Sequence, residues 1–325
     1  MSPDSPTIRP TALLFAIGCA AALLGLGGRR GLIRRHRPTP ARILGGLALT
    51  WASLVVVGAA IYLGTGTIDR LDDALVESAA GFSTTSVTTL DPAQLDVAMQ
   101  LWRAATQWVG GLIGLLAGVV ALPLALRNSA TVGIDSRHTA DRLAPTPVVG
   151  RQRVLAIYTL LTVVLGVAYA LAGLGPTDST SHALTTISTG GFSTRADSMT
   201  SFAPAVRVVA TIGMIIAGTG MPLIWWTLRG RLAPVWRSTE LRIYLALLAA
   251  GSALVLAGSD LGTGDAIVTT VSAVSTTGFA SHDWTTLDDG VLTVLLLLIA
   301  TGAMSASMGG LRVIRAWTLV SFAAR

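Results

Sequence analysis

The chain has 325 residues, of which 52% are hydrophobic and only 12% are charged. This composition, with a mean hydropathy of +0.66, excludes an ordinary soluble globular domain and indicates a membrane protein. A formal net charge of +6 would favour nucleic-acid binding in a soluble protein, but the basic residues are all arginines that lie mainly between apolar stretches. We therefore expect no nucleic-acid partner. The single cysteine, Cys19, lies in an apolar run and forms neither a disulfide framework nor a cysteine metal site.

Several apolar stretches approach or exceed the roughly 20 residues that a helix needs to cross a bilayer. The first is followed by arginines instead of a small-residue cleavage site, so we interpret it as a retained helix and not as a signal peptide. The predicted membrane spans cover 11–28, 41–64, 100–126, 151–174, 203–228, 239–258 and 290–319.

Arginines in the loops predict the orientation, because arginine near the end of a span resists translocation. Loops 29–42, 127–153 and 229–242 carry six, five and four arginines, whereas loops 65–99, 175–202 and 259–289 carry one, one and none. The arginine-poor loops also hold thirteen of the seventeen acidic residues. We therefore expect the N-terminus outside, the C-terminus in the cytoplasm and three acidic loops facing outwards.

The three outer loops contain an internal repeat. Asp73–Val87 aligns without a gap with Asp265–Phe279, sharing an Asp-Ala opening and a Ser-Thr-Thr close, and Ile187–Phe192 resembles Val274–Phe279. Three span–loop–span units are predicted, after an N-terminal segment with an extra transmembrane helix and a basic cytoplasmic loop. Their bounds are 1–40 for the N-terminal segment and 41–126, 151–228 and 239–319 for the units.

A short helix followed by Ser, Thr and Gly between two spans indicates a pore loop, since irregular backbone at membrane depth must line water or be buried in protein. A half-helix that enters from outside points the negative end of its dipole at the bilayer centre, where a cation is stabilised. Glycine lets the chain turn its carbonyls toward an axis, where they replace a cation's hydration shell. The absence of carboxylates from these motifs favours a monovalent cation. We therefore expect an all-α membrane protein with a cation pore.

These motifs resemble the Trk/Ktr/HKT superfamily of potassium transporters, most closely the bacterial TrkH type, over about 41–319. The matching motifs are Glu77-Ser78, Gly81, Ser83-Thr84-Thr85, Gln107-Trp108-Val109-Gly110-Gly111, Ala121-Leu122-Pro123, Ser188–Thr194, Thr276–Phe279 and Gly309–Arg315. The resemblance implies units around a pseudo-fourfold pore, potassium uptake across the plasma (inner) membrane, a homodimer and a cytosolic nucleotide-binding regulatory subunit. It implies no cofactor besides the transported potassium, or sodium.

The resemblance also implies the site residues. A selectivity filter would bind K⁺ at Thr84, Thr85, Ser86, Thr189, Gly190, Gly191, Thr276, Thr277 and Gly278, and the family's glycine-rich gate would correspond to Gly302, Gly309 and Gly310. Met304 and Met308 interrupt that run, so an ordinary kinked helix is an equal interpretation there. Glu77 is expected behind the filter.

The chain departs from the family pattern in two ways. The family has four units and this sequence holds three, so a fragment, a truncated reading frame and one piece of a split assembly all remain open, and a non-conducting subunit is one alternative function. Ser86 stands where the family usually has the first filter glycine, unless Gly81 is taken as the equivalent. Serine at this position goes with sodium selectivity in the plant branch, so a sodium-permeable or weakly selective pore is a second alternative.

Arg103 and Arg207 lie near the outer ends of their spans. They could reach toward the membrane interface, or support the filter by contacting a pore-helix carboxylate such as Glu77. The four histidines lie in different loops without ligand spacing, which argues against a metal site. No Gly-x-Ser-x-Gly motif or Ser/His/Asp arrangement is found, so we do not expect an enzyme.

Overall fold

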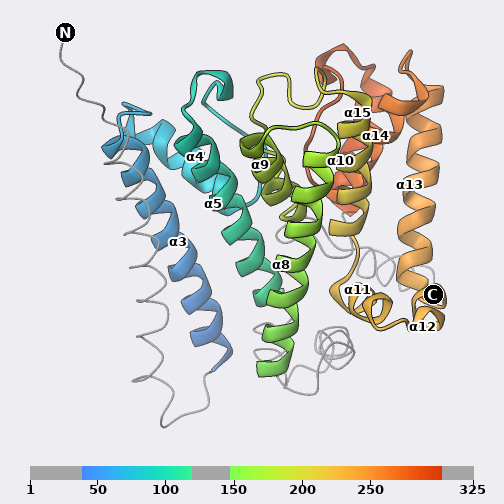
Figure 1. The fold of residues 1–325 in the computed structure, drawn as a ribbon, viewed down its shortest axis with the longest axis horizontal. Helices are drawn as coiled ribbons and strands as arrows, with labels where there is room; N and C mark the ends of the chain where they lie inside the picture. The colour runs from blue at the N-terminus through green and yellow to red at the C-terminus, as the bar shows by residue number, and fades with distance from the viewer. Residues whose placement is uncertain (1–38, 119–146, 302–325) are drawn as a thin grey trace.

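The computed structural model describes residues 39–118 and 147–301, and within them every regular element is helical (Figure 1). These helices form three successive units, each with a first helix, a short second helix and a third helix. Unit 1 comprises α3 (Pro40–Gly64), α4 (Leu71–Phe82) and α5 (Val97–Leu116); unit 2 comprises α8 (Pro147–Leu171), α9 (Pro176–Ile187) and α10 (Pro204–Ala217); unit 3 comprises α13 (Thr239–Ala257), α14 (Thr263–Ser275) and α15 (Asp289–Thr301).

The first helix of each unit is long and apolar enough to cross a membrane, with 24, 24 and 19 qualifying residues in α3, α8 and α13. Each of these helices buries only a minor share of its apolar window inside the protein. Leu49, Val56 and Leu160, for example, have exposed side chains. Since such apolar surface is stable in lipid and not in water, these faces fit a bilayer.

The second helices α4, α9 and α14 have 12, 12 and 13 residues, which is too short to cross a bilayer. Each carries aspartate in its first turn, where the helix dipole favours negative charge: Asp72 and Asp73, Asp178, and Asp265. Each packs against the first helix of its own unit, while α5 packs on α9 and α10 packs on α14. The short helices are therefore enclosed by their neighbours, with α5 joining unit 1 to unit 2 and α10 joining unit 2 to unit 3.

The stretch 203–228, expected as one span, consists of two helices, α10 and α11 (Met221–Leu228), bent by 105°. Gly218 and Gly220 flank the break, and Pro222 lies in the first turn of α11. The Tyr244 hydroxyl donates a hydrogen bond to Ile215 O near the end of α10 at 3.3 Å. A short helix α12 (Leu232–Trp236) then leads to α13. The predicted span 11–28 and the ends of those at 100–126 and 290–319 lie outside the described residues.

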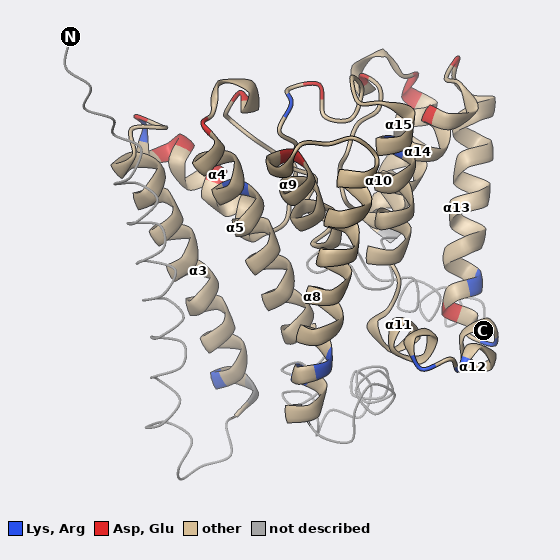
Figure 2. Cartoon of the chain, in the orientation of Figure 1, with Lys and Arg blue, Asp and Glu red and all other residues tan. Residues whose placement is uncertain are grey.

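The linkers that follow the short helices of units 1 and 3 repeat a second pattern, Asp-x-x-x-Leu-Asp, at 91–96 and 283–288. Asp91 caps the 3₁₀ helix η1 (Pro92–Gln94) by accepting from Ala93 N, and Asp283 caps η3 (Trp284–Thr286) by accepting from Thr285 N. The hydrogen bonds that the Thr285 N–H and hydroxyl donate to Asp283 hold the pKa of this carboxyl below its usual value. Most of the acidic residues in the described part of the chain gather at the end of the molecule where the short helices begin, whereas α8, the start of α3 and the residues on either side of α12 carry arginine at the opposite end (Figure 2).

Candidate functional site

The three short helices end in the same backbone turn. A threonine one or two residues after each helix, Thr84, Thr189 or Thr276, has a positive φ of 56°, 52° or 59°. In each turn the threonine N–H bonds to the carbonyl three residues back, and the following N–H bonds to the carbonyl five residues back. A positive φ is uncommon for a threonine, so its recurrence at three equivalent places marks a common construction. We call Thr84–Ser86, Thr189–Gly191 and Thr276–Gly278 turn segments 1, 2 and 3.

The turn segments establish which residue of unit 1 corresponds to the glycines of units 2 and 3. Gly191 and Gly278 also have positive φ, of 77° and 83°, whereas Ser86 does not. Gly81 lies inside α4 and its carbonyl accepts from Thr84 N–H, so it is part of the helix and not of the turn. The structure therefore favours the gapless alignment, with Ser86 as the counterpart of the two glycines.

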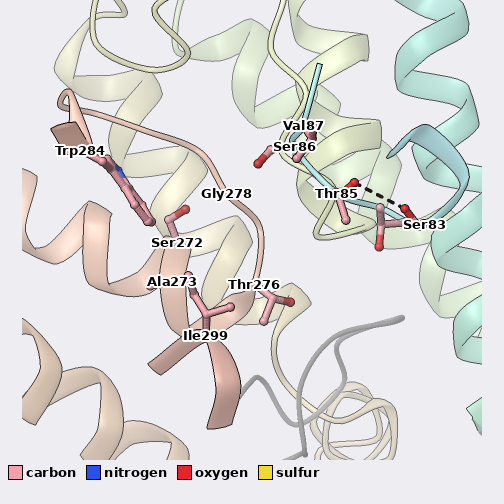
Figure 3. A pocket seen from close by; sticks show the side chains of 11 residues that line it. Ser83, Thr85, Ser86, Val87, Ser272, Ala273, Thr276, Gly278, Trp284 and Ile299 are labelled. Carbon is pink, nitrogen blue, oxygen red and sulfur yellow. Dashed lines mark hydrogen bonds between the residues drawn. The ribbon is translucent and has the colours of Figure 1, made fainter. Parts of the chain in front are cut away.

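All three turn segments meet. A Cβ added to Gly191 would lie 1.9 Å from Thr277 O and 3.1 Å from Ser86 Cβ. A Cβ added to Gly278 would lie 2.3 Å from Ser86 Oγ. Both positions thus require glycine for space as well as for backbone conformation. The Ser86 side chain is directed toward the chain at Gly278 (Figure 3).

Two neighbouring cavities, of about 400 and 650 Å³, adjoin this meeting point. Both are bordered by Ser86, Gly278, Trp284 and Ile299. The smaller one is lined almost wholly by the turn segments and neighbouring residues of units 1 and 3. Segment 2 is buried, whereas Thr85 and Ser86 are exposed. The arrangement offers main-chain carbonyls and hydroxyls, which are ligands for weakly hydrated cations.

The carboxylate of Glu77 and the guanidinium of Arg103 form an ion pair behind turn segment 1, with Nε and Oε1 2.7 Å apart. The Thr88 hydroxyl and Thr89 N–H also donate to the carboxylate, and Arg103 lies over the Phe192 ring at 4.3 Å. In unit 2, Arg207 bonds to Asp265 of α14 at 2.8 Å. Both arginines therefore contact pore-helix carboxylates, which was the second of the two interpretations from sequence.

Other side chains that fix the turn segments were missed from sequence. Gln107 of α5 bonds to segments 1 and 2, and only the Gln-Trp-Val-Gly-Gly motif signalled it. Trp51 Nε1 donates to Phe82 O at the end of α4. His182, which the sequence presents only as one of four scattered histidines, lies buried in α9 with its Nε2 3.1 Å from Ser193 Oγ, just after segment 2. The predicted gate residues Gly302, Gly309 and Gly310 lie outside the described residues.

Comparison with known proteins shows which family has this arrangement. A family model described as the TrkH cation transport protein matches residues 53–261, which is more than half of the chain. The chain belongs to this family. The structure resembles the crystal structure of the potassium transporter TrkH from Vibrio parahaemolyticus with a TM-score of 0.77 and 25% identity, covering 98% of this chain and 74% of that one.

Two curated relatives of this TrkH-family chain illustrate how much of the length is shared. The Trk system potassium uptake protein TrkH of Escherichia coli is 30% identical over 295 residues, which are 83% of this chain and 59% of the relative. TrkI of Halomonas elongata is 28% identical over 257 residues, or 75% of this chain and 52% of the relative. The chain thus spans between half and two thirds of the length of these relatives. The family is one of cation transport proteins, and the described part of this chain has helices that are long and apolar enough to cross a membrane.

Proposed function

We propose that this chain is a pore-forming subunit for potassium uptake, and that it transports ions without catalysing a reaction. The convergence of three half-helices on one point carries the proposal, because the C-terminal end of a helix is negative and stabilises a cation. The turn segments at these ends present carbonyl and hydroxyl oxygens without carboxylates, which suits a monovalent cation. The relatives named above are potassium uptake proteins, which agrees with this assignment.

The proposed filter is the set of three turn segments, and the transported K⁺ is its only metal. The distribution of charge indicates from which side the short helices enter the membrane. Acidic residues at the start of the short helices concentrate cations at the outer mouth by their summed field, and arginines at the opposite end favour the cytoplasmic side. We therefore propose that the short helices enter from outside, in the plasma (inner) membrane, with the C-terminus in the cytoplasm.

We further infer that another unit completes the filter. Segment 2 is enclosed by its neighbours, whereas segments 1 and 3 leave polar groups facing a cavity. Polar backbone that faces lipid would be costly, so a further pore helix, from the same polypeptide or another, would cover this side. Likeness to the family supports a homodimer and a cytosolic nucleotide-binding regulatory subunit as partners. Without the further unit, a non-conducting subunit remains the alternative.

The test is potassium uptake by the assembled protein. Expression in a bacterium that lacks its own potassium uptake systems should restore growth at low potassium, and proteoliposomes should take up radioactive rubidium. Gly278→Ala, which would strain the backbone and collide with Ser86, should abolish the flux while the protein remains in the membrane. Absence of flux from an assembly that contains the further unit, at matched protein amount, would reject the proposed function in favour of the non-conducting subunit.

Ser86 supports a second candidate, a sodium-permeable or weakly selective pore. Its Oγ would lie only 2.3 Å from a Cβ at Gly278, so the hydroxyl occupies space where the turn segments meet. A side chain there narrows the path and adds one oxygen ligand, which favours a smaller cation. Measuring sodium and potassium flux side by side separates this candidate from potassium selectivity.

A further inference from the structure

Gln107 joins turn segments 1 and 2 from behind. Its side chain is fully buried, and Nε2 donates to Thr85 O at 3.0 Å and to Gly190 O at 2.7 Å. Oε1 accepts from Phe192 N at 3.1 Å. Only an amide nitrogen donates to two carbonyls and only an amide oxygen accepts from an N–H, so these partners determine the orientation of the side chain. One residue of α5 therefore holds two segments that are far apart in sequence.

Gly190 is shaped for this contact. Its φ lies outside the left-handed region, so its backbone conformation does not call for glycine. A Cβ at Gly190 would instead lie 2.3 Å from Gln107 Oε1 and 2.4 Å from Gln107 Cδ. The glycine is required because the amide packs directly against the main chain.

The two carbonyls that Gln107 binds belong to equivalent positions, since Thr85 and Gly190 are the second residues of their turn segments. A carbonyl that accepts a buried N–H is directed at that donor, and turning it toward a cation would leave a buried polar hydrogen unpaired. The equivalent carbonyl of unit 3, Thr277 O, faces Gly191 instead. The carbonyls at the second position of turn segments 1 and 2 thus form hydrogen bonds within the protein.

We propose that Gln107 is a positioning residue for ion selectivity, which sets the spacing of turn segments 1 and 2 and withholds the carbonyls of Thr85 and Gly190 from the cation. The proposal rests on the proposed function, because it assumes that the turn segments bind the transported ion. The cation ligands then come from the carbonyls that precede and follow these two in the turn segments. Loss of the amide frees two oxygens and lets the two segments move apart, so ions of different radius are discriminated less well.

The test compares two glutamines of the same helix. Gln107→Leu removes the amide at similar length, and Gln107→Asn keeps an amide but withdraws it by one methylene. Gln100→Leu is the matched control, because Gln100 lies seven residues earlier and its Nε2 also donates to two main-chain carbonyls, Pro92 O at 3.1 Å and Leu95 O at 3.4 Å. Those carbonyls lie in the outer linker and not in a turn segment.

Potassium, rubidium and sodium fluxes are measured for each variant in proteoliposomes of the complete assembly, at equal protein amount. Either Gln107 variant should lower the ratio of potassium to sodium flux by at least about threefold, which is the effect expected from the loss of about one hydrogen bond. Gln100→Leu should leave this ratio unchanged. A role confined to stability would reduce folded protein and total flux without moving the ratio. Gln107→Asn decides the question if Gln107→Leu does not fold.

The outcomes distinguish the two proposals. If the unaltered assembly carries no cation, the proposed function fails before any variant is compared. If it conducts and a folded Gln107 variant keeps the parental ratio, the role of Gln107 in selectivity is overturned while the proposed function stands. The same holds if Gln100→Leu changes the ratio as much as the Gln107 variants.

Discussion

The guanidinium of Arg103 lies 2.7 Å from the carboxylate of Glu77, and these side chains are only 2% and 0% exposed. The pair links the short helix α4 to α5, and through Thr88 it also holds the chain that follows turn segment 1. Arg103 further stacks on Phe192 of unit 2. A buried ion pair with this many hydrogen bonds fixes the relative position of the parts that it joins.

Glu77→Gln should therefore destabilise the protein strongly. The variant leaves the Arg103 cation buried without a counter-ion, and breaking a buried pair in this way costs about 3–5 kcal/mol. The measurement is unfolding in detergent, followed by tryptophan fluorescence. Asp72→Asn serves as the control, because Asp72 pairs with Arg70 on the exposed surface and its loss should destabilise the protein far less than Glu77→Gln.

The double variant Glu77→Gln, Arg103→Met tests the cause of that loss. Removing both charges takes away the unpaired cation, so the double variant should be more stable than the sum of the two single variants implies. Strict additivity would mean that the two side chains act independently, and it would contradict the coupling inferred from the structure.

Sequence alone could locate the turn segments because their chemistry is local. The Ser-Thr-Thr close of units 1 and 3 directly follows a short apolar helix, and the positive φ of Thr84 and Thr276 arises within that same stretch. Contacts across units could not be located in this way. Gln107 bonds to carbonyls 22 and 83 residues away, and no spacing rule links such positions.

Sequence left the partner of Arg103 open and did not predict the bend in the stretch 203–228, for a similar reason. An arginine near the end of a span has two stable environments, the membrane interface and a buried carboxylate, and only the packing of α4 on α5 decides between them. The stretch 203–228 is apolar throughout its middle, so its length and composition predict one span. At the break Gly218 packs against Tyr244 of the next unit, whose hydroxyl would lie 2.4 Å from a Cβ at this position, and no local pattern reveals that contact.

Ser86→Gly should raise the ratio of potassium to sodium flux. The substitution removes the hydroxyl that lies against Gly278 and lets segment 1 adopt the positive φ seen at Gly191 and Gly278. A preference of about 0.7 kcal/mol between the two ions corresponds to a change of about threefold. Ser53→Ala is the control, because the Ser53 hydroxyl bonds to Leu49 O within α3 and not to a turn segment. An unchanged ratio in Ser86→Gly would remove the sodium-permeable candidate.

Gly110→Ala should destabilise the packing of α4 against α5. A Cβ at Gly110 would lie 2.3 Å from Phe82 O, and main-chain atoms cannot move aside as a flexible side chain can. Overpacking of this kind costs about 1–3 kcal/mol, measured as a lower unfolding temperature in detergent. Gly46→Ala in α3, which has nothing within 4 Å of the added Cβ, should be neutral or stabilising by up to about 1 kcal/mol. Equal effects at both sites would contradict the close approach.

Gly191→Ala should abolish cation flux. Gly191 has a φ of 77°, a conformation that strains alanine by about 1–3 kcal/mol, and the added Cβ would lie 1.9 Å from Thr277 O. The turn segments of units 2 and 3 would be forced apart at the point where they meet. Gly264→Ala, in the first turn of α14 with open space around it, should keep the parental flux and shows that an added methyl group in this region is tolerated elsewhere.

A comparison of Gly278→Ala with Gly191→Ala separates collision with a side chain from collision with the main chain. At Gly278 the added Cβ would meet only the Ser86 side chain, so adding Ser86→Gly to Gly278→Ala should restore part of the lost flux. At Gly191 the nearest contact is a main-chain carbonyl, and Ser86→Gly should restore nothing there. Flux of radioactive rubidium into proteoliposomes, normalised to folded protein, measures both cases. Rescue of Gly191→Ala by Ser86→Gly would mean that Ser86, and not the carbonyl of Thr277, sets the limit on space between the turn segments.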